Sequence, residues 1–206
     1  MLPAMDGTDG PDWPAYYRHT LGREPRPLFV RGMAAVRAAG VAPGQAVEIG
    51  FGDGTETIAL LADGWGVVAV EATPAAEAVV RPRVPAGAAH RLDVRIGAAQ
   101  DVPLPVFDLL YAGYPLSFIN PARFEEFWAG IRHALRPGGH LVVNIFGDRD
   151  SWAGDPLMTF VDRDGLDRLL NGLEVLDLQV EDADGPSFSG PKHWHVFDVI
   201  ARRPSA

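Results

Sequence analysis

Short apolar stretches recur along this chain and alternate with longer segments in which apolar residues return every three or four positions. Short apolar runs are typical of buried parallel strands, and the three- to four-residue spacing is typical of helices with one buried face. Regular alternation of the two indicates an α/β fold with helices on both faces of one sheet. The predicted strands are residues 47–49, 67–71, 91–96, 106–112, 140–146, 173–180 and 192–200.

The connection before the last predicted strand differs from the others. Residues 184–192 are rich in glycine and proline and lack a helical pattern, so a crossover helix is not expected there. We therefore predict a doubly wound, mostly parallel seven-stranded sheet whose last strand is antiparallel. Helices are predicted after Thr55 and over residues 28–39, 74–81, 121–135 and 159–170. The helix at 28–39 is expected to bury Leu28, Val30, Met33 and Val36.

Residues 47–55 carry the most distinctive pattern, with glycine at every second position (Gly50, Gly52 and Gly54) directly after a predicted strand. Glycine accepts positive φ angles and lets a ligand approach the main chain closely. A strand, a glycine turn and a helix N-terminus together present free N–H groups at the carboxyl edge of a parallel sheet. Glu71 ends the next predicted strand, where an acid can accept the hydroxyl groups of a ribose. The sequence therefore predicts a nucleoside-binding site.

The charge around this turn indicates which nucleoside compound it suits. The spacing differs from the G-x-G-x-x-G pattern of dinucleotide sites, in which a helix packs closely under a pyrophosphate. Two acids, Glu48 and Asp53, flank the turn. Carboxylates there would repel a pyrophosphate and would suit a ligand with an ammonium or sulfonium group. A dinucleotide-dependent oxidoreductase is therefore the disfavoured alternative.

An acid, an apolar residue and G-x-G-x-G resemble motif I of the class I S-adenosylmethionine (SAM)-dependent methyltransferases, although Glu48 and Phe51 stand where Asp and Cys are commoner. The turn at residues 135–139 adds to this resemblance, which covers residues 28–203. It implies a Rossmann-like fold, SAM as the cofactor and methyl transfer to an acceptor. Ala98 departs from the family, because many members have an Asp there that binds the adenine amino group. The cofactor-binding residues that the resemblance implies are Glu48, Gly50, Gly52, Asp53, Gly54, Glu71, Ala72, Ala99, Gln100 and Ala112.

Two further segments resemble one small group within these enzymes, the tellurite-resistance methyltransferases. One segment is residues 52–54 together with Gly64 and Trp65, and the other is the closing stretch at residues 192–197. Members of that group methylate small oxyanions such as tellurite and selenite, or other compact acceptors. The resemblance thus implies a small-molecule acceptor.

Side chains at the ends of the later strands, together with residues of the N-terminal segment, are candidates for binding the acceptor or for catalysis. Arginine offers forked donors to an oxyanion, and a neutral histidine can take a proton from an acceptor that carries one. The candidate catalytic residues are Arg149, His193 and His195, and the candidate substrate-binding residues are Tyr17, Arg18, Tyr114 and Trp152.

Other roles for these residues stay open. The charges at residues 148–150 could belong to a solvated loop, and either histidine could be packed and hydrogen-bonded. His193 and His195 on one strand face could also share a metal ion, but the sequence identifies no third ligand, so we predict no metal. A SAM-binding protein without turnover is a further alternative.

The N-terminal segment is expected to lie outside the sheet. Residues 1–27 are predicted to form an extension and residues 28–206 the methyltransferase domain, with Met1–Pro11 frayed. Aromatic residues gather at 13–17. In the family such a segment commonly lies across the cofactor as a lid, whereas a simpler interpretation is that it covers an apolar surface.

Composition narrows the partners of the protein. The 206 residues carry a net charge of −9, with no basic cluster, which argues against nucleic acid or an anionic membrane as a partner. Cysteine is absent, and neither a secretory signal nor a membrane-spanning run is present. We expect a cytoplasmic enzyme, monomeric or homodimeric, with a small-molecule partner.

Overall fold

A seven-stranded sheet forms the centre of the molecule in a computed structural model that describes residues 12–205. The predicted fraying of Met1–Pro11 lies outside these described residues. The strands follow the order β3-β2-β1-β4-β5-β7-β6 across the sheet. Their bounds are β1 Gln45–Ile49, β2 Gly66–Glu71, β3 Leu92–Ile96, β4 Phe107–Ala112, β5 Leu135–Phe146, β6 Glu174–Ser187 and β7 Gly190–Arg202.

Pairing between the strands confirms the predicted topology. Strands β1 to β5 are joined by parallel pairings, and β7 runs antiparallel to both β5 and β6. The order reverses between β1 and β4, which leaves a crevice at the carboxyl ends of these strands. Ligands of open α/β sheets bind at such a switch point.

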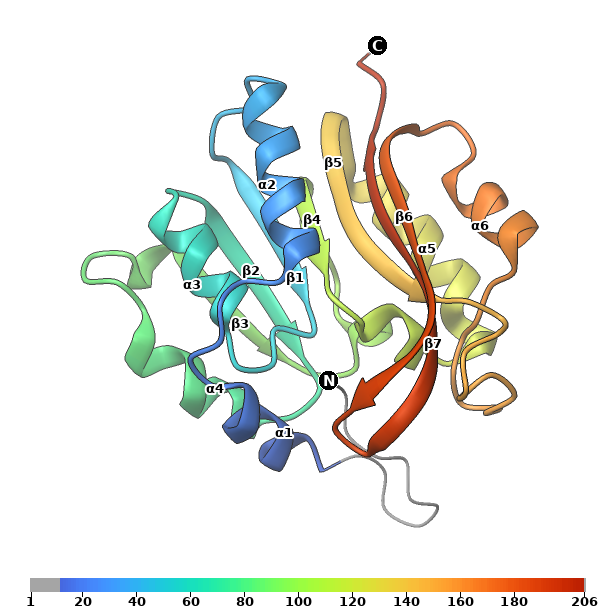
Figure 1. Cartoon of the computed structure of the whole chain (residues 1–206). Coiled ribbons are helices and arrows are strands. Elements are labelled where there is room, and N and C mark those ends of the chain that lie inside the picture. Colours follow the sequence, from blue (N-terminus) through green and yellow to red (C-terminus); the bar gives the residue numbers. More distant parts are fainter. Residues whose placement is uncertain (1–11, 206) are drawn as a thin grey trace.

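Helices cover both faces of the sheet (Figure 1). Successive residues of the buried strands point to opposite faces, so each strand contributes to two apolar clusters. One cluster contains side chains of α2, α3 and α4, and the other contains side chains of α5 and α6. The helices are α1 Trp13–Thr20, α2 Pro27–Ala38, α3 Thr55–Ala62, α4 Ala75–Val80, α5 Pro121–Ala134 and α6 Arg163–Leu170.

Two details of the predicted helices are wrong. Val30 points to solvent and is 55% exposed, because the buried face of α2 consists of Leu28, Phe29, Met33 and Val36 instead. Helix α6 begins at Arg163 and not at Thr159, since the Asp162 side chain caps it by accepting the N–H of Gly165.

The last hairpin is also more regular than the sequence suggests. Strand β6 continues to Ser187 and β7 starts at Gly190, so only two residues, Phe188 and Ser189, connect them. The polar and glycine-rich residues in this stretch pair across the hairpin, as Asp184 does with His193. The tip reaches α1, where the Phe188 ring lies edge to face against Tyr16 at 5.9 Å between ring centroids.

Candidate functional site

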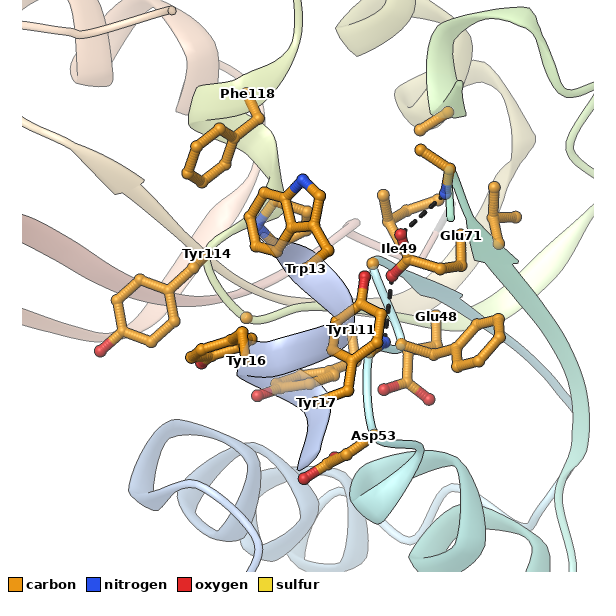
Figure 2. Close-up of a pocket in the computed structure, with 18 of the residues that line it drawn as sticks. Trp13, Tyr16, Tyr17, Glu48, Ile49, Asp53, Glu71, Tyr111, Tyr114 and Phe118 are labelled. Atoms are coloured by element: carbon orange, nitrogen blue, oxygen red, sulfur yellow. Dashed lines mark hydrogen bonds between the residues drawn. The ribbon is translucent and has the colours of Figure 1, made fainter. Parts of the chain in front are cut away.

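A cavity of about 390 Å³ lies at the carboxyl ends of β1, β2 and β4, beneath α1 (Figure 2). The glycine turn after β1 and Glu71 at the end of β2 form one side of it. Residues 97–100 follow β3, and the exit of β4 contributes Gly113 and Tyr114. The cavity therefore occupies the crevice that the strand order creates.

The glycine turn brings the main chain to the cavity wall. Gly50, Gly52 and Gly54 all have positive φ angles, between 52° and 76°. A Cβ atom on Gly50 would lie 2.6 Å from the Cβ of Pro115, and one on Gly52 would lie 3.3 Å from the Tyr17 ring. Side chains would therefore clash at Gly50 and crowd Gly52, so the sequence has glycine there for conformation and for space.

Glu71 is held in place by the main chain around it. One carboxylate oxygen accepts the N–H groups of Ala72 at 2.8 Å and Thr73 at 3.2 Å, and the other accepts the Gly52 N–H at 3.1 Å. Burial raises the pKa of Glu71, although these N–H donors favour its ionised form. A carboxylate has about four lone-pair positions, and the N–H groups of Gly52, Ala72 and Thr73 use three of them, so one remains for a hydroxyl group of a ligand.

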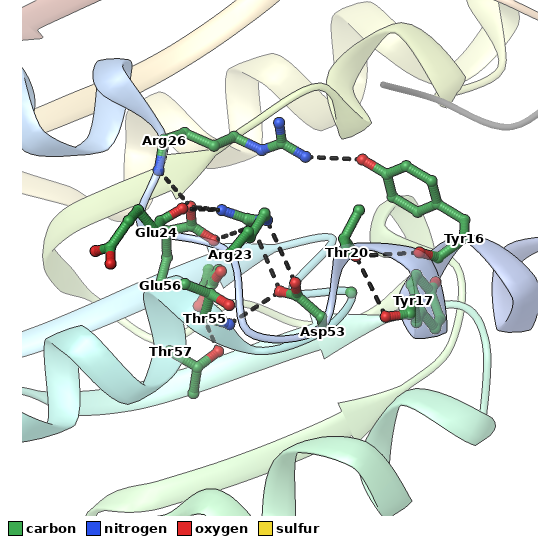
Figure 3. Close-up of polar contacts among 12 residues, drawn as sticks. Tyr16, Tyr17, Thr20, Arg23, Glu24, Arg26, Asp53, Thr55, Glu56 and Thr57 are labelled. Atoms are coloured by element: carbon green, nitrogen blue, oxygen red, sulfur yellow. Dashed lines mark hydrogen bonds and ion pairs between the residues drawn. The ribbon is translucent and has the colours of Figure 1, made fainter. Parts of the chain in front are cut away.

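The other acids at the turn have protein partners, which alters the charge expected there (Figure 3). Arg23 forms a bidentate ion pair with Glu56, with both N···O distances at 2.6 Å, and it also lies 3.3 Å from Asp53. Asp53 in addition accepts the Thr55 N–H at the start of α3. Burial and the charge of Glu56 raise the pKa of Glu48, which accepts a hydrogen bond from Thr57 at 2.5 Å. Little negative charge is thus left free at the turn itself.

A guanidinium and an unpartnered hydroxyl face the cavity beside β4. Arg26 donates to the Tyr16 hydroxyl at 2.8 Å and lies 4.8 Å above the Tyr114 ring. Among the described residues no carboxylate lies within ion-pair distance of the Arg26 guanidinium. The Tyr111 hydroxyl is buried and has no hydrogen-bond partner within residues 12–205. A Cβ on Gly113 would touch both the Tyr111 hydroxyl and Arg26, which shows how close these two groups are.

The structure brings most of the predicted cofactor residues to this cavity. Its lining includes Glu48, Gly50, Gly52, Asp53, Glu71, Ala72, Ala99 and Gln100, together with the predicted substrate residues Tyr17 and Tyr114. Gly54 faces Val80 on α4, and Ala112 is buried in the cluster under α5 and α6. Neither Gly54 nor Ala112 lines the cavity, and neither does Arg18.

The three candidate catalytic residues lie outside the cavity. Arg149 pairs with Asp182 at 2.5 Å, and the main-chain N–H of Arg149 donates to His195 at 3.1 Å. His193 lies 2.9 Å from both Asp182 and Asp184 on the hairpin. The Arg149 guanidinium thus contacts the His195 ring and shares Asp182 with His193, and none of the three residues lines the cavity.

Trp152 takes part in a cage around Lys192, the only lysine of the sequence. The Lys192 ammonium lies 3.5 Å from the Trp152 ring centroid and 4.0 Å from that of Trp194. It also pairs with the buried Asp150 at 2.5 Å. This cage ties the loop after β5 to β7 behind the cavity wall, without reaching the cavity. Burial lowers the pKa of Lys192. The bond to Asp150 acts in the opposite direction, but it does not outweigh the effect of burial.

Several lining residues escaped the sequence analysis. Arg23 and Arg26 belong to a proline-containing stretch between two helices, and Tyr111 stands within an apolar strand. Two buried arginines beside an acid-rich turn are a usable signal, because charges enter a core only when paired. No group of three or more His, Cys, Asp or Glu within residues 12–205 is placed to hold a metal ion.

Residues 46–139 match a family model described as a methyltransferase domain. This part of the chain is therefore similar to a methyltransferase domain. The match runs from β1 into β5, so it contains the glycine turn and Glu71. SAM is the cofactor that this domain implies.

A curated relative agrees with the match to the methyltransferase family model. An uncharacterized methyltransferase of Synechocystis sp. is 30% identical over 102 residues, which are 48% of this chain and 46% of the relative. The chain thus spans about half the length of that curated relative.

Two solved structures share the fold of most of the chain. TehB from Haemophilus influenzae has a TM-score of 0.66 and 14% identity, covering 84% of this chain and 62% of its own. The 1,6-didemethyltoxoflavin-N1-methyltransferase of Burkholderia thailandensis, solved with 1,6-didemethyltoxoflavin and S-adenosylhomocysteine, has a TM-score of 0.64 and 19% identity, covering 98% of this chain and 94% of its own. The predicted class I methyltransferase fold is confirmed. None of the helices within residues 12–205 combines the length and apolarity that a membrane crossing requires.

Proposed function

We propose that this protein transfers the methyl group of SAM to a small-molecule acceptor. The observation that carries the proposal is the convergence of the glycine turn and Glu71 on one cavity at the switch point of the sheet. The methyltransferase domain supports it, because the domain contains both features.

The residues around the cavity fit SAM. Glu71 would accept a ribose hydroxyl, and residues 97–100 would border the adenine. The amino acid part of SAM has a carboxylate, for which Arg26 and the unpartnered Tyr111 hydroxyl are the available donors. A buried hydroxyl without a partner is costly, so a ligand that satisfies it gains affinity. Arg149, His193 and His195 receive no role in binding SAM.

Methyl transfer places few chemical demands on the protein. When bound, SAM supplies a methyl group on an already activated sulfonium, so the chain mainly has to align the acceptor and exclude water. Helix α1 covers the cavity with Trp13, Tyr16 and Tyr17 and thereby helps to exclude water. Positioning alone can lower such a barrier by roughly 7–11 kcal/mol.

Cavity size supports a small acceptor. The space of about 390 Å³ is enclosed by side chains of α1 and the strand ends, and such a volume is typical of small-molecule sites. The relation to the tellurite-resistance group is supported by the distant structural similarity to TehB alone.

Binding and turnover can be tested separately. Calorimetry with SAM and with NAD should show binding of SAM only, and preferential binding of NAD would refute the proposal. Radiolabelled SAM incubated with thiols, amines, phenols and oxyanions should then give a methylated product. Tight SAM binding without any product would favour a SAM-binding protein without turnover.

A further inference from the structure

We propose that the methyl acceptor is a planar aromatic compound whose nucleophile is a nitrogen or sulfur attached to, or part of, the ring. This inference rests on the proposed function and specifies the acceptor class. It concerns the part of the cavity farthest from Glu71, which is lined by Trp13, Tyr114, Phe118, Leu157 and Met158 (Figure 2).

Aromatic and apolar side chains enclose that part. Trp13 stands edge to face against Phe118 with 5.2 Å between ring centroids, and against Tyr16 with 6.0 Å. Leu157, 64% exposed, lies at the opening and Met158 lies beside it. These rings contact one another edge to face and form an aromatic wall of the cavity, against which a flat ring can pack with favourable stacking or edge contacts.

Tyr114 adds an independent observation. It is the only residue other than glycine with a positive φ angle, 79°, within residues 12–205. Its N–H donates to the Asn144 side chain at 2.6 Å, and Phe146 and Trp194 lie behind its ring at 6.1 Å. A non-glycine residue in this conformation costs about 1–3 kcal/mol, and such strain concentrates at ligand sites. The fold thus holds an aromatic ring in a strained backbone conformation at the cavity wall.

Charge in the lining argues against an oxyanion acceptor. The two guanidinium groups of the lining are Arg23, paired with Glu56 and Asp53, and Arg26, which the proposed function assigns to the SAM carboxylate. Arg18 and Arg149 do not reach the cavity. A second anion would therefore lack a free cation among the described lining residues.

The same lining selects the nucleophile. It contains no histidine, lysine or cysteine among the described residues, and its carboxylates are bonded to protein groups: Asp53 and Glu56 to Arg23, Glu48 to Thr57, and Glu71 to main-chain N–H groups. No free base therefore stands beside the acceptor in the described lining. An aryl amine, ring nitrogen or aryl thiolate has a free lone pair at neutral pH. That lone pair forms the bond to the methyl carbon while the electrons of the carbon–sulfur bond return to sulfur. Any proton on the nitrogen then leaves to water.

Thiophenol, 2-mercaptoethanol and selenite are the probes of a direct test, with the full chain and labelled SAM. We expect kcat/KM for thiophenol to exceed that for the other two by about tenfold or more. In Trp13→Ala, activity should fall for every acceptor because the cavity opens to water, and the ratio of kcat/KM for thiophenol to that for 2-mercaptoethanol should fall about tenfold. Leu157→Ala, at the opening, should show the same selective loss in a variant with little effect on folding.

Two controls separate the possible failures. Val30→Ala, exposed on α2 and outside the lining, should leave the acceptor ratio unchanged. Faster methylation of selenite than of thiophenol, or equal losses for both thiols in both cavity variants, would overturn the aromatic acceptor and leave the methyltransferase standing. A wild-type protein that fails to bind SAM would instead overturn the proposed function.

Discussion

Glu71 shows how a single carboxylate can be prepared for a ligand. Three main-chain N–H groups hold it before any ligand is bound, so its orientation costs no side-chain entropy on binding. Two of those groups come from its own turn and the third from Gly52. The glycine turn and the acid are therefore one unit, although they lie on neighbouring strands.

Replacing Glu71 by Gln should weaken SAM binding by about 1–3 kcal/mol, the scale of hydrogen bonds to a charged group. Titration calorimetry measures this loss directly. Glu77→Gln, on α4 and paired only with Arg81, is the matched control and should bind SAM normally. An unchanged affinity in Glu71→Gln would show that the ribose does not bind here.

Tyr111→Phe removes a hydroxyl that has no partner in the described chain. The free energy of unfolding should stay constant or rise by up to about 1 kcal/mol, while the affinity for SAM falls. Tyr16→Phe is the matched control, because its hydroxyl accepts a bond from Arg26 and its loss should destabilise the fold by about 0.5–1.5 kcal/mol. Chemical denaturation and calorimetry check both variants. A Tyr111→Phe protein with normal SAM affinity would contradict the assignment.

At this scale the sequence identifies residues whose role depends on local pattern. Gly50, Gly52 and Glu71 are found from spacing along the chain, and the structure brings them together. Arg26 and Tyr111 are not found, because their meaning depends on contacts between distant segments. Asp53 was expected to leave its charge free, but Arg23, thirty residues earlier, pairs with it.

Among the elements, the loop after β5 depends on one buried ion pair. Lys192 on β7 and Asp150 on the loop are almost fully buried, with side-chain exposures of 4% and 0%. Asp150 also accepts the N–H groups of Trp152 and His195, so it joins the loop to β7 at several points. The loop continues to Leu157 and Met158 at the cavity opening.

Lys192→Met should lower the free energy of unfolding by about 3–5 kcal/mol, because it leaves the Asp150 carboxylate buried and unpaired. The double variant Lys192→Met/Asp150→Asn removes that charge and should recover part of the loss. Urea denaturation of the wild type, the single variants Lys192→Met and Asp150→Asn, and the double variant gives the coupling between the two residues. Additive losses would show that the pair is not coupled.

Elements with strong periodicity are predicted well, and those with mixed signals are not. Asn120 caps α5 as its sequence indicates, accepting the Ala122 N–H at 2.9 Å. The length of the β6–β7 hairpin was underestimated, because the glycine, proline and serine residues at 184–190 are typical of a loop. Cross-strand pairing outweighs their weak strand preference.

At the scale of the whole molecule, stability depends on pH through buried groups far from the cavity. His140 at β5 is fully buried with no partner for either ring nitrogen within residues 12–205. Burial, together with the charge of Arg202, lowers the pKa of His140 below its ordinary value of 6.5. The unfolded chain therefore binds a proton more readily than the folded one, and stability falls as the pH drops below about 6.5.

His140→Leu should remove this component of the pH dependence. Between pH 7.5 and about 5.5 the wild type should lose more stability than the variant, and thermal unfolding across that range measures the difference. Glu48 shifts the balance the other way, since its raised pKa gives stability at low pH that is lost as the pH rises. Identical pH profiles for the two proteins would show that His140 titrates normally.

Global topology is the part of the structure that the sequence specifies best. Alternating strands and helices, a switch in strand order and an irregular last connection suffice for the doubly wound sheet with its antiparallel strand. Closure of the cavity, unlike the topology, cannot be predicted from the sequence. It depends on α1, whose aromatic residues fit either a lid or a simple cover, and only the three-dimensional arrangement shows them lining the site.

The contact between Phe188 at the hairpin tip and Tyr16 on α1 has a consequence for biosynthesis. A chain emerging from the ribosome holds α1 early, but Phe188 is made 172 residues after Tyr16. Sealing of the methyl-transfer chamber is therefore among the last events of assembly, after the sheet has formed. Truncated translation products would keep the glycine turn and yet leave the chamber open to water.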